Sequence, residues 1–283
     1  MIEDQRIAII GGTGKFGQHL GRLLEDGNEI VITGSTVSKA ERIAEGYDWE
    51  AATNEDAVKD ADVVIVSVPI QYTIETIDEI GPHIDDNTLL CDVTSVKQKP
   101  CDAMQKYSDQ VLGMHPMYAP SNSPENQNVI LCPIEGKKWT MMEEFWIEHN
   151  ANISIVEPEE HDKAVSVVQG LTHFTEMVFA QTIQDLDAGD TEKYETPVFQ
   201  IIRDLANRMF NQQSGLYQSI QNENPENTEM REHFIDSAEK TIENIENEEL
   251  KDVFESLGKD QDMEGVQRRT DELIELLTNK LRN

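Results

Sequence analysis

Residues Arg6–Gly17 read RIAIIGGTGKFG, and this stretch decides the fold of the N-terminal half. Its first part, Arg6–Ile10, is a short apolar run of the kind that forms a strand buried on both faces of a sheet. Gly12, Gly14 and Gly17 follow with the spacing G-x-G-x-x-G. Such glycines permit a tight turn, close approach of the backbone to a pyrophosphate, and close packing of the next helix on the strand.

The residues after these glycines predict a helix, because apolar side chains recur there at helical spacing. A helix that begins at a glycine turn directs its free N–H groups and its dipole toward bound phosphates. We therefore predict that a dinucleotide binds here rather than that the turn is purely structural. The candidate cofactor-binding residues of the turn are Gly12, Thr13, Gly14, Lys15, Phe16 and Gly17.

The end of the second predicted strand, Glu29–Thr33, bears on the choice of cofactor. A site for NAD usually carries Asp or Glu about 20 residues past the glycines, bonded to the ribose 2′-hydroxyl. Here the sequence GST follows the strand instead. Ser35, with Lys39 nearby, could accept a 2′-phosphate, so we expect NAD(P) with a preference for NADP. In another interpretation Ser38 caps the next helix and Glu41 completes a capping box, and both can hold together.

Strands and helices alternate as far as Val156, which predicts an α/β fold with a doubly wound, Rossmann-type domain. One strand, Asp62–Pro69, ends in Val68 and Pro69, which we expect beside the nicotinamide ribose. After Val156 the pattern is helical throughout. The sequence therefore predicts a dinucleotide-binding domain at 1–156 and a helical domain at 157–283 for substrate binding and dimerisation. The expected helices are Glu159 to about Asp187, Pro197–Phe210, Leu216–Asn222, Glu226–Asn247 and Glu248–Leu281, with a loop at Ala188–Thr196.

Two polar residues are expected just past the carboxyl ends of strands, where an open parallel sheet binds its ligands. Ser95 follows the predicted strand Thr88–Val93, and His115 follows Val111–Met114. An imidazole there is suited to take a proton from a substrate hydroxyl, although a histidine bonded into the sheet edge is the alternative. Ser95 could bond that hydroxyl or orient the imidazole, or it could serve only as a helix N-cap.

The predicted helical domain offers weaker candidates. His173 lies mid-helix on an expected inward face, and by itself it indicates a core histidine. Arg208 could bind a substrate carboxylate through its guanidinium, or it could pair with Asp204 one turn away. We expect the His161-Asp162 pair only to decorate the first turn of its helix. No cluster of side chains suggests a metal site.

The charge balance excludes some partners. The 283-residue chain has 23 Lys and Arg against 55 Asp and Glu, a net charge of −32. Such a field repels nucleic acid and anionic membranes, so we expect neither as a partner. The acids are spread along the chain, which favours a halophilic, salt-adapted surface over an acidic tail. Three cysteines without metal spacing, no apolar run near the ~20 residues of a membrane span, and no room for a signal peptide predict a soluble cytoplasmic protein.

These motifs together resemble the prephenate dehydrogenase family of tyrosine biosynthesis. The most specific are DVTSVK at Asp92–Lys97 and GMHPM at Gly113–Met117. With the glycine turn, EEHD at 159–162, QGLTHF at 169–174 and the segment from Arg208 to Tyr217, the resemblance covers most of residues 6–222. It implies oxidative decarboxylation of prephenate with hydride transfer to NAD(P)⁺, and a homodimer built through the helical domain.

The resemblance also implies roles for individual residues. His115 would take the proton from the C4 hydroxyl of prephenate, and Ser95 would hold that hydroxyl or the imidazole. His173 would approach the substrate, and Arg208 would bind one of its carboxylates. Three alternatives stay open at this point. They are an arogenate dehydrogenase, an NADP-dependent oxidoreductase of the deazaflavin-linked kind, and a redox-sensing module that binds dinucleotide without turnover.

Overall fold

The chain folds into two units in the computed structural model, which describes residues 2–186, 191–211, 214–259 and 262–281. Unit 1 comprises Met1–Val165 with Asn222–Pro225, and unit 2 comprises Ser166–Gln221 with Glu226–Asn283. The helix that follows Pro158 therefore groups with the sheet. The domain limits inferred from the sequence, 1–156 and 157–283, remain a proposal.

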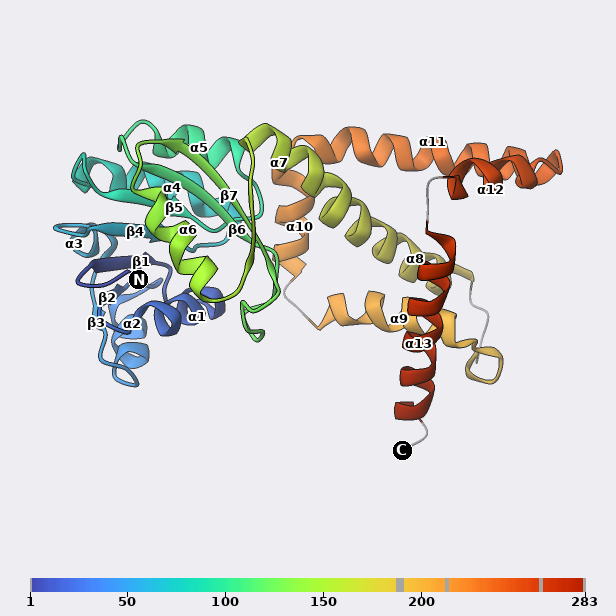
Figure 1. The fold of residues 1–283 in the computed structure, drawn as a ribbon, viewed down its shortest axis with the longest axis horizontal. Coiled ribbons are helices and arrows are strands. Elements are labelled where there is room, and N and C mark those ends of the chain that lie inside the picture. The colour runs from blue at the N-terminus through green and yellow to red at the C-terminus, as the bar shows by residue number, and fades with distance from the viewer. Residues whose placement is uncertain (1, 187–190, 212–213, 260–261, 282–283) are drawn as a thin grey trace. The chain divides into compact units, whose positions relative to one another are not determined.

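Unit 1 contains an eight-stranded sheet with the strand order β3-β2-β1-β4-β5-β6-β7-β8 (Figure 1). Neighbouring strands are parallel except β6 and β7, which run antiparallel. The sheet confirms the predicted Rossmann-type α/β fold, although the antiparallel pair departs from the parallel sheet that we expected. The strands are β1 (Arg6–Ile10), β2 (Glu29–Ile32), β3 (Glu50–Ala51), β4 (Val63–Val66), β5 (Leu89–Asp92), β6 (Val111–Pro116), β7 (Asn128–Glu135) and β8 (Asn152–Ile155).

Helices cover both faces of this sheet, and each face has its own apolar core. Successive residues of a strand point to opposite faces, so Ile7 and Ile9 of β1 join one core while Ala8 and Ile10 join the other. The first core is closed by α1 (Lys15–Leu24), α2 (Val37–Ala44) and α6 (Trp139–Glu148). The second is closed by α3 (Asn54–Ala57), α4 (Ile70–Ile80) and α5 (Gln98–Met104).

Strand β6 continues beyond its predicted end. We expected His115 to lie past the strand, but β6 runs to Pro116 and His115 lies opposite Ile130 of β7. The antiparallel partner extends the hydrogen-bonded ladder to the last residues of β6, which the sequence of β6 alone does not indicate. The backbone of His115 is consequently held by the sheet rather than by a loop.

Helix α2 begins two residues earlier than the predicted cap requires. Its N-cap is Thr36, whose hydroxyl accepts a hydrogen bond from the amide of Lys39 at 3.2 Å. The interpretation of Ser38 as the cap is therefore wrong, because Ser38 already lies within the first turn of the helix.

The three cysteines of unit 1 are free and buried. Two of them flank Gly113 of β6, where an added Cβ would lie 2.7 Å from Cys101 Sγ and 3.4 Å from Cys132 Cβ. Burial raises the pKa of Cys132 to about 12 and raises that of Cys91 well above its ordinary range. The thiols are therefore protonated and packed as small apolar side chains.

The described part of unit 2 is helical, as the sequence predicts. The predicted helix from Glu159 is divided by a π-helical segment, Ser166–Leu171, between α7 (Pro158–Val165) of unit 1 and α8 (Thr172–Leu186) of unit 2. The predicted helix Glu248–Leu281 is likewise two helices. Asp187 and residues 188–190 of the predicted loop lie outside the described residues. The further elements are the 3₁₀ turn Glu192–Tyr194, α9 (Pro197–Phe210), α10 (Ser214–Glu223, which ends in unit 1), α11 (Glu226–Glu246), α12 (Leu250–Gly258) and α13 (Met263–Leu281).

A search of the described residues for a helix with the length and apolar character of a membrane span finds none.

Candidate active site

Four neighbouring strands bring the candidate residues of unit 1 to one edge of the sheet. The glycine turn follows β1, Val68 follows β4, Ser95 follows β5, and His115 lies near the end of β6. The register pairs Ile10 with Val66, Val66 with Asp92, and Asp92 with Gly113, so these strand ends stand in one row. Strands β1 and β6 are three spacings apart, about 14 Å.

The glycine turn has the geometry that a bound pyrophosphate requires. Gly11 adopts a φ of 83°, in the left-handed region that favours glycine. A Cβ on Gly17 would lie 2.7 Å from the Cα of Gly12, so α1 packs directly on the turn. Gly14 is the N-cap of α1 and provides no side-chain cap to the first-turn N–H groups. These residues fit a dinucleotide, because such N–H groups bind phosphate.

Gly34 and Val68 border the turn on its two sides. A Cβ on Gly34 would lie 2.6 Å from Thr13 Cγ2, and a Cβ on Gly11 would lie 2.9 Å from Val68 Cγ1. The ends of β2 and β4 therefore meet the turn, as the predicted cofactor site requires. Pro69 follows Val68 as the exposed N-cap residue of α4.

The remaining cofactor candidates lie at the surface near this turn. Lys15 and Ser35 are exposed, and Phe16 is half-buried. The Phe16 ring lies 5.9 Å, centroid to centroid, from the ring of Tyr118, in the segment after His115. Contact of these three residues with a cofactor stays a prediction.

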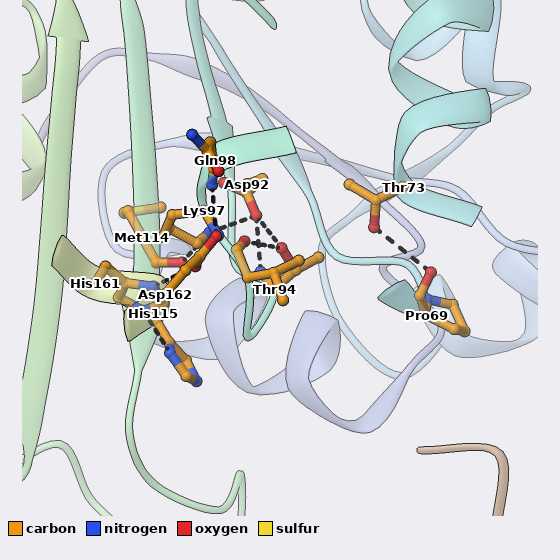
Figure 2. A network of polar contacts seen from close by, with 11 residues as sticks. Pro69, Thr73, Asp92, Thr94, Lys97, Gln98, Met114, His115, His161 and Asp162 are labelled. Atoms are coloured by element: carbon orange, nitrogen blue, oxygen red, sulfur yellow. Dashed lines mark hydrogen bonds and ion pairs between the residues drawn. The ribbon is translucent and has the colours of Figure 1, made fainter. Parts of the chain in front are cut away.

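His115 belongs to a chain of hydrogen bonds that the sequence analysis missed. Its Nδ1 lies 2.9 Å from Nε2 of His161, and Nδ1 of His161 lies 2.8 Å from Oδ1 of Asp162 (Figure 2). His115 is 3% exposed, His161 2% and Asp162 1%. The expectation that His161 and Asp162 only decorate their helix is wrong, because this side of α7 is buried within unit 1 against His115 and Lys97.

Asp162 also fixes the start of α5. Its Oδ1 accepts a hydrogen bond from the amide of Lys97 at 2.7 Å, and its Oδ2 accepts one from the amide of Gln98 at 3.0 Å. The cap of α5 therefore comes from α7. Ser95 is not the N-cap, since that position belongs to Lys97 and Ser95 lies half-buried two residues earlier on the loop after β5.

A buried ion pair supports the backbone next to His115. Lys97 Nζ lies 2.5 Å from Asp92 Oδ2 and donates a hydrogen bond to the carbonyl of Met114 at 2.8 Å (Figure 2). Asp92 Oδ2 also accepts hydrogen bonds from the amide and hydroxyl of Thr94 at 2.9 and 2.5 Å. Both charged side chains are fully buried, so removing one would leave an unpaired buried charge, at a cost of about 3–5 kcal/mol. The pair holds β6 in place one residue before His115.

The surroundings of the two imidazoles keep them uncharged. Burial lowers the pKa of His115 well below its ordinary value, and the neighbouring His161 and the cationic Lys97 lower it further. Burial also lowers the pKa of His161, against the opposing effect of its hydrogen bond to Asp162. Both rings are therefore neutral at pH 7, and a neutral imidazole is the form that acts as a general base.

In unit 2, His173 of α8 lies near Tyr217 of α10. Their rings are edge to face with centroids 4.9 Å apart. The buried Nδ1 of His173 has no hydrogen-bond partner among the described residues, and burial lowers the pKa of this imidazole. The structure therefore does not show the satisfied core histidine of the alternative interpretation, and a role of His173 in substrate binding stays a prediction.

Arg208 of α9 acts electrostatically on the same neighbourhood. Burial raises the pKa of Tyr217 and of Glu176, and the charge of Arg208 lowers both. Among the ion pairs of the described residues, Asp204 bonds Arg203 at 3.3 Å, and no pair with Arg208 is found. The sequence analysis missed Glu176 and Tyr217, although Glu176 lies one helical turn beyond His173.

Family models match both halves of the chain. "Prephenate dehydrogenase, nucleotide-binding domain" matches residues 21–155, and "Prephenate dehydrogenase, dimerization domain" matches residues 157–259. The first match begins after the glycine turn. The two matches together extend over most of the chain.

Two curated relatives show similarity over long stretches. The "Probable arogenate/prephenate dehydrogenase" of Methanocaldococcus jannaschii is 33% identical over 255 residues, which cover 86% of this chain and 57% of that protein. The "T-protein" of Haemophilus influenzae is 30% identical over 270 residues, which cover 92% of this chain and 67% of that protein. The chain thus spans between about half and two thirds of the length of these relatives.

A solved structure shares the fold. The crystal structure of prephenate dehydrogenase from A. aeolicus, in complex with hydroxyphenyl propionate and NAD⁺, matches with a TM-score of 0.77. The match covers 96% of this chain and 99% of that chain at 20% sequence identity.

Proposed function

This chain belongs to the prephenate dehydrogenase family, and on that premise we propose that it catalyses the oxidative decarboxylation of prephenate to 4-hydroxyphenylpyruvate in tyrosine biosynthesis. One observation carries the proposal. A buried, neutral imidazole, that of His115, lies at the sheet edge that also holds a glycine turn fit for a dinucleotide.

Each candidate residue of unit 1 has a defined task in this reaction. NAD(P)⁺ would supply the hydride acceptor, held by the turn Gly12–Gly17 with Val68 and Pro69 beside its nicotinamide ribose. His115 takes the proton from the C4 hydroxyl of prephenate, and Ser95 holds that hydroxyl or the imidazole. As the C4 hydride leaves and the ring carboxylate departs as CO₂, the ring becomes aromatic, and its phenolate oxygen takes the proton back from His115. The chain therefore needs only to orient the substrate, accept a proton and bind anions.

In unit 2 we assign the substrate-binding tasks to Arg208 and His173. A guanidinium can bind a carboxylate through two parallel hydrogen bonds, and Arg208 could bind one carboxylate of prephenate in this way. The orphaned Nδ1 of His173 supplies a further polar contact. Arogenate, which carries an amino acid side chain in place of the pyruvyl group, is the alternative substrate for the same residues.

The residues after β2 favour NADP over NAD. Ser35, Thr36 and Lys39 are exposed there, and no acidic residue stands at the position that bonds a ribose 2′-hydroxyl. A 2′-phosphate would meet hydroxyls and a cation. A smaller Michaelis constant for NADP⁺ than for NAD⁺ in the same assay is the expected result.

We further propose that the active form is a homodimer assembled through unit 2. Its α8 spans 15 residues without a buried side chain. Several large apolar side chains of the other helices of unit 2 are about half exposed or more, among them Leu205, Phe210, Phe254, Leu257, Leu273 and Leu276. Exposed apolar surface on this scale indicates an interface. A second copy is the occupant that the description of the matching family model names.

The assay that tests the activity follows reduced cofactor on mixing purified protein, in molar KCl, with prephenate or arogenate and NAD⁺ or NADP⁺. We predict that His115→Asn lowers kcat by about 100-fold or more, on the scale of losing a general base. The dissociation constant of the cofactor should change little, because the substitution leaves the glycine turn intact. Near-normal turnover in this variant would refute the role of His115. Tight cofactor binding with no turnover of either substrate by the parent would instead favour a redox-sensing module.

For Arg208→Ala we predict a rise of at least tenfold in the KM of the acidic substrate, because about 1.4 kcal/mol of carboxylate binding corresponds to that factor. Lys193→Ala, which removes an exposed cation elsewhere in unit 2, is the matched control. Steady-state kinetics of both variants measure the effect. An unchanged KM would return Arg208 to the role of a surface residue.

A further inference from the structure

The chain His115–His161–Asp162 is closed off from solvent along its length. The two contacts within it are 2.9 and 2.8 Å long, and none of the three residues is more than 3% exposed. The sheet register fixes the position of His115, and helix α7 places a second imidazole and a carboxylate directly behind it (Figure 2). Each hydrogen bond in the chain needs one donor and one acceptor, so the position of every proton can be derived.

The derivation starts at Asp162. Backbone amides can only donate, and the amides of Lys97 and Gln98 are bonded to Oδ1 and Oδ2 of this side chain. Both oxygens are thus acceptors, and the carboxylate carries no proton. Nδ1 of His161, bonded to Oδ1, must therefore be the donor and carry a hydrogen.

The assignment then passes from one ring to the next. A neutral imidazole protonated at Nδ1 has a bare Nε2, so His161 accepts a hydrogen bond at Nε2. The donor is Nδ1–H of His115, 2.9 Å away. Burial lowers the pKa of both rings and keeps each to a single proton, with Asp162, Asp92 and Lys97 as the charged groups that act on them. Nε2 of His115 therefore carries no hydrogen.

We propose that His161 and Asp162 are positioning residues, which fix His115 in the tautomer whose Nε2 can accept a proton. The inference rests on the proposed role of His115 as the base. It assigns a kinetic function to a pair that would otherwise only attach α7 to the sheet. If the pair only attached α7 to the sheet, its substitution would change stability but not the tautomer of His115. The two roles can therefore be separated by experiment.

The tautomer itself can be observed without any turnover. Long-range ¹H–¹⁵N spectra of the full chain labelled with ¹⁵N-histidine distinguish Nδ1–H from Nε2–H, and loss of a signal in His115→Asn assigns the ring. We expect His115 protonated at Nδ1 in the parent protein. In Asp162→Ala the acceptor for Nδ1–H of His161 is removed, so both rings should lose their fixed preference for the Nδ1–H form. A parent His115 protonated at Nε2 would overturn the proposal.

Kinetics of His161 variants provide the second test. His161→Leu removes the acceptor for Nδ1–H and should lower kcat by about 100-fold, within the range of general-base effects, with KM changed less than threefold. In His161→Gln an amide oxygen can accept the same hydrogen, so at least a tenfold recovery over His161→Leu is expected. Equal activity of the two variants, when both are folded by circular dichroism, would contradict the proposal.

Two controls separate positioning from general damage. Glu160→Gln removes an exposed carboxylate of the same helix and should leave kcat within twofold of the parent. Adding His161→Leu to His115→Asn should cause no further loss, because the pair acts only through His115. An additional tenfold loss in that double variant would count against the proposal. If the parent turns over neither substrate, the proposed function fails, while the ¹⁵N spectra still decide the tautomer.

Discussion

A single residue, His115, sets the pH range in which the proposed reaction can proceed. A general base works in its unprotonated form, so activity is lost as the pH falls through its pKa. Burial, His161 and Lys97 all lower that pKa from an ordinary value of about 6.5. The direction of the shift therefore moves the loss of activity toward acid.

We accordingly predict that kcat/KM is constant from pH 8 to about pH 6.5 and falls only below it, since this ratio reports the free enzyme's base. Initial rates at constant ionic strength across pH 5 to 8 measure the profile. His161→Gln leaves the ring of His115 buried, so its profile should also fall only on the acid side. An acid limb centred above pH 6.5 would contradict the burial argument.

Residue identities along the chain made His115 and Ser95 candidates, and the family resemblance added roles for His173 and Arg208. They were not enough to find the partner of His115, because His161 lies 46 residues away in sequence and only the packing of α7 brings it near. The one available signal was that a histidine and an aspartate stand together in the EEHD motif. Periodicity within one helix cannot show which distant side chain a residue will bond.

At the scale of the element, the contact between α1 and the glycine turn leaves no room for a side chain at Gly17. A Cβ on Gly17 would meet the Cα of Gly12 at 2.7 Å and the carbonyl oxygen of Gly11 at 2.8 Å, and both are backbone atoms that cannot rotate away. Gly215 of α10 is the contrasting case, with nothing within 4 Å of an added Cβ.

We predict that Gly17→Ala destabilises unit 1 by about 1–3 kcal/mol, the usual cost of overpacking, and weakens dinucleotide binding. Gly215→Ala should be neutral or stabilise by up to about 1 kcal/mol, because alanine favours a helix. Urea unfolding and titration with NADP⁺, both followed by tryptophan fluorescence, compare the two. Equal stability and affinity in Gly17→Ala and the parent protein would refute the close packing inferred here.

Elements with strong periodicity were predictable, and their junctions were not. Strand β1, helix α1 and helix α9 lie where the apolar patterns place them. The antiparallel β7 is set by the course of the segment 117–127, which carries no apolar pattern. The π-helical turn at Ser166–Leu171 adds a residue to a helical turn at a local energetic cost, and only tertiary contacts can stabilise it.

For the whole molecule, the net charge of −32 opposes both folding and the proposed dimerisation. The Debye length falls from about 10 Å at 0.1 M salt to about 3 Å at 1 M, so salt relieves the repulsion. The composition alone reveals this repulsion, whereas the surface proposed to meet a second copy depends on how the helices of unit 2 fold.

We predict that the thermal midpoint rises, and that the sedimenting species shifts from monomer to dimer, between 0.1 and 2 M KCl. NaCl at the same ionic strength should act alike, because screening depends on charge and concentration rather than on the cation. Differential scanning calorimetry and sedimentation velocity provide the two measurements. Full stability in dilute buffer would contradict the salt-adaptation proposal.

The buried cysteines have a practical consequence. Each is protonated and enclosed by the sheet and its helices, so an alkylating reagent cannot reach sulfur while these layers stay together. The labelling rate under native conditions therefore reports how often that part of the chain opens to solvent, with no introduced probe. For the same reason, mild oxidants should leave the native molecule chemically unaltered at these positions.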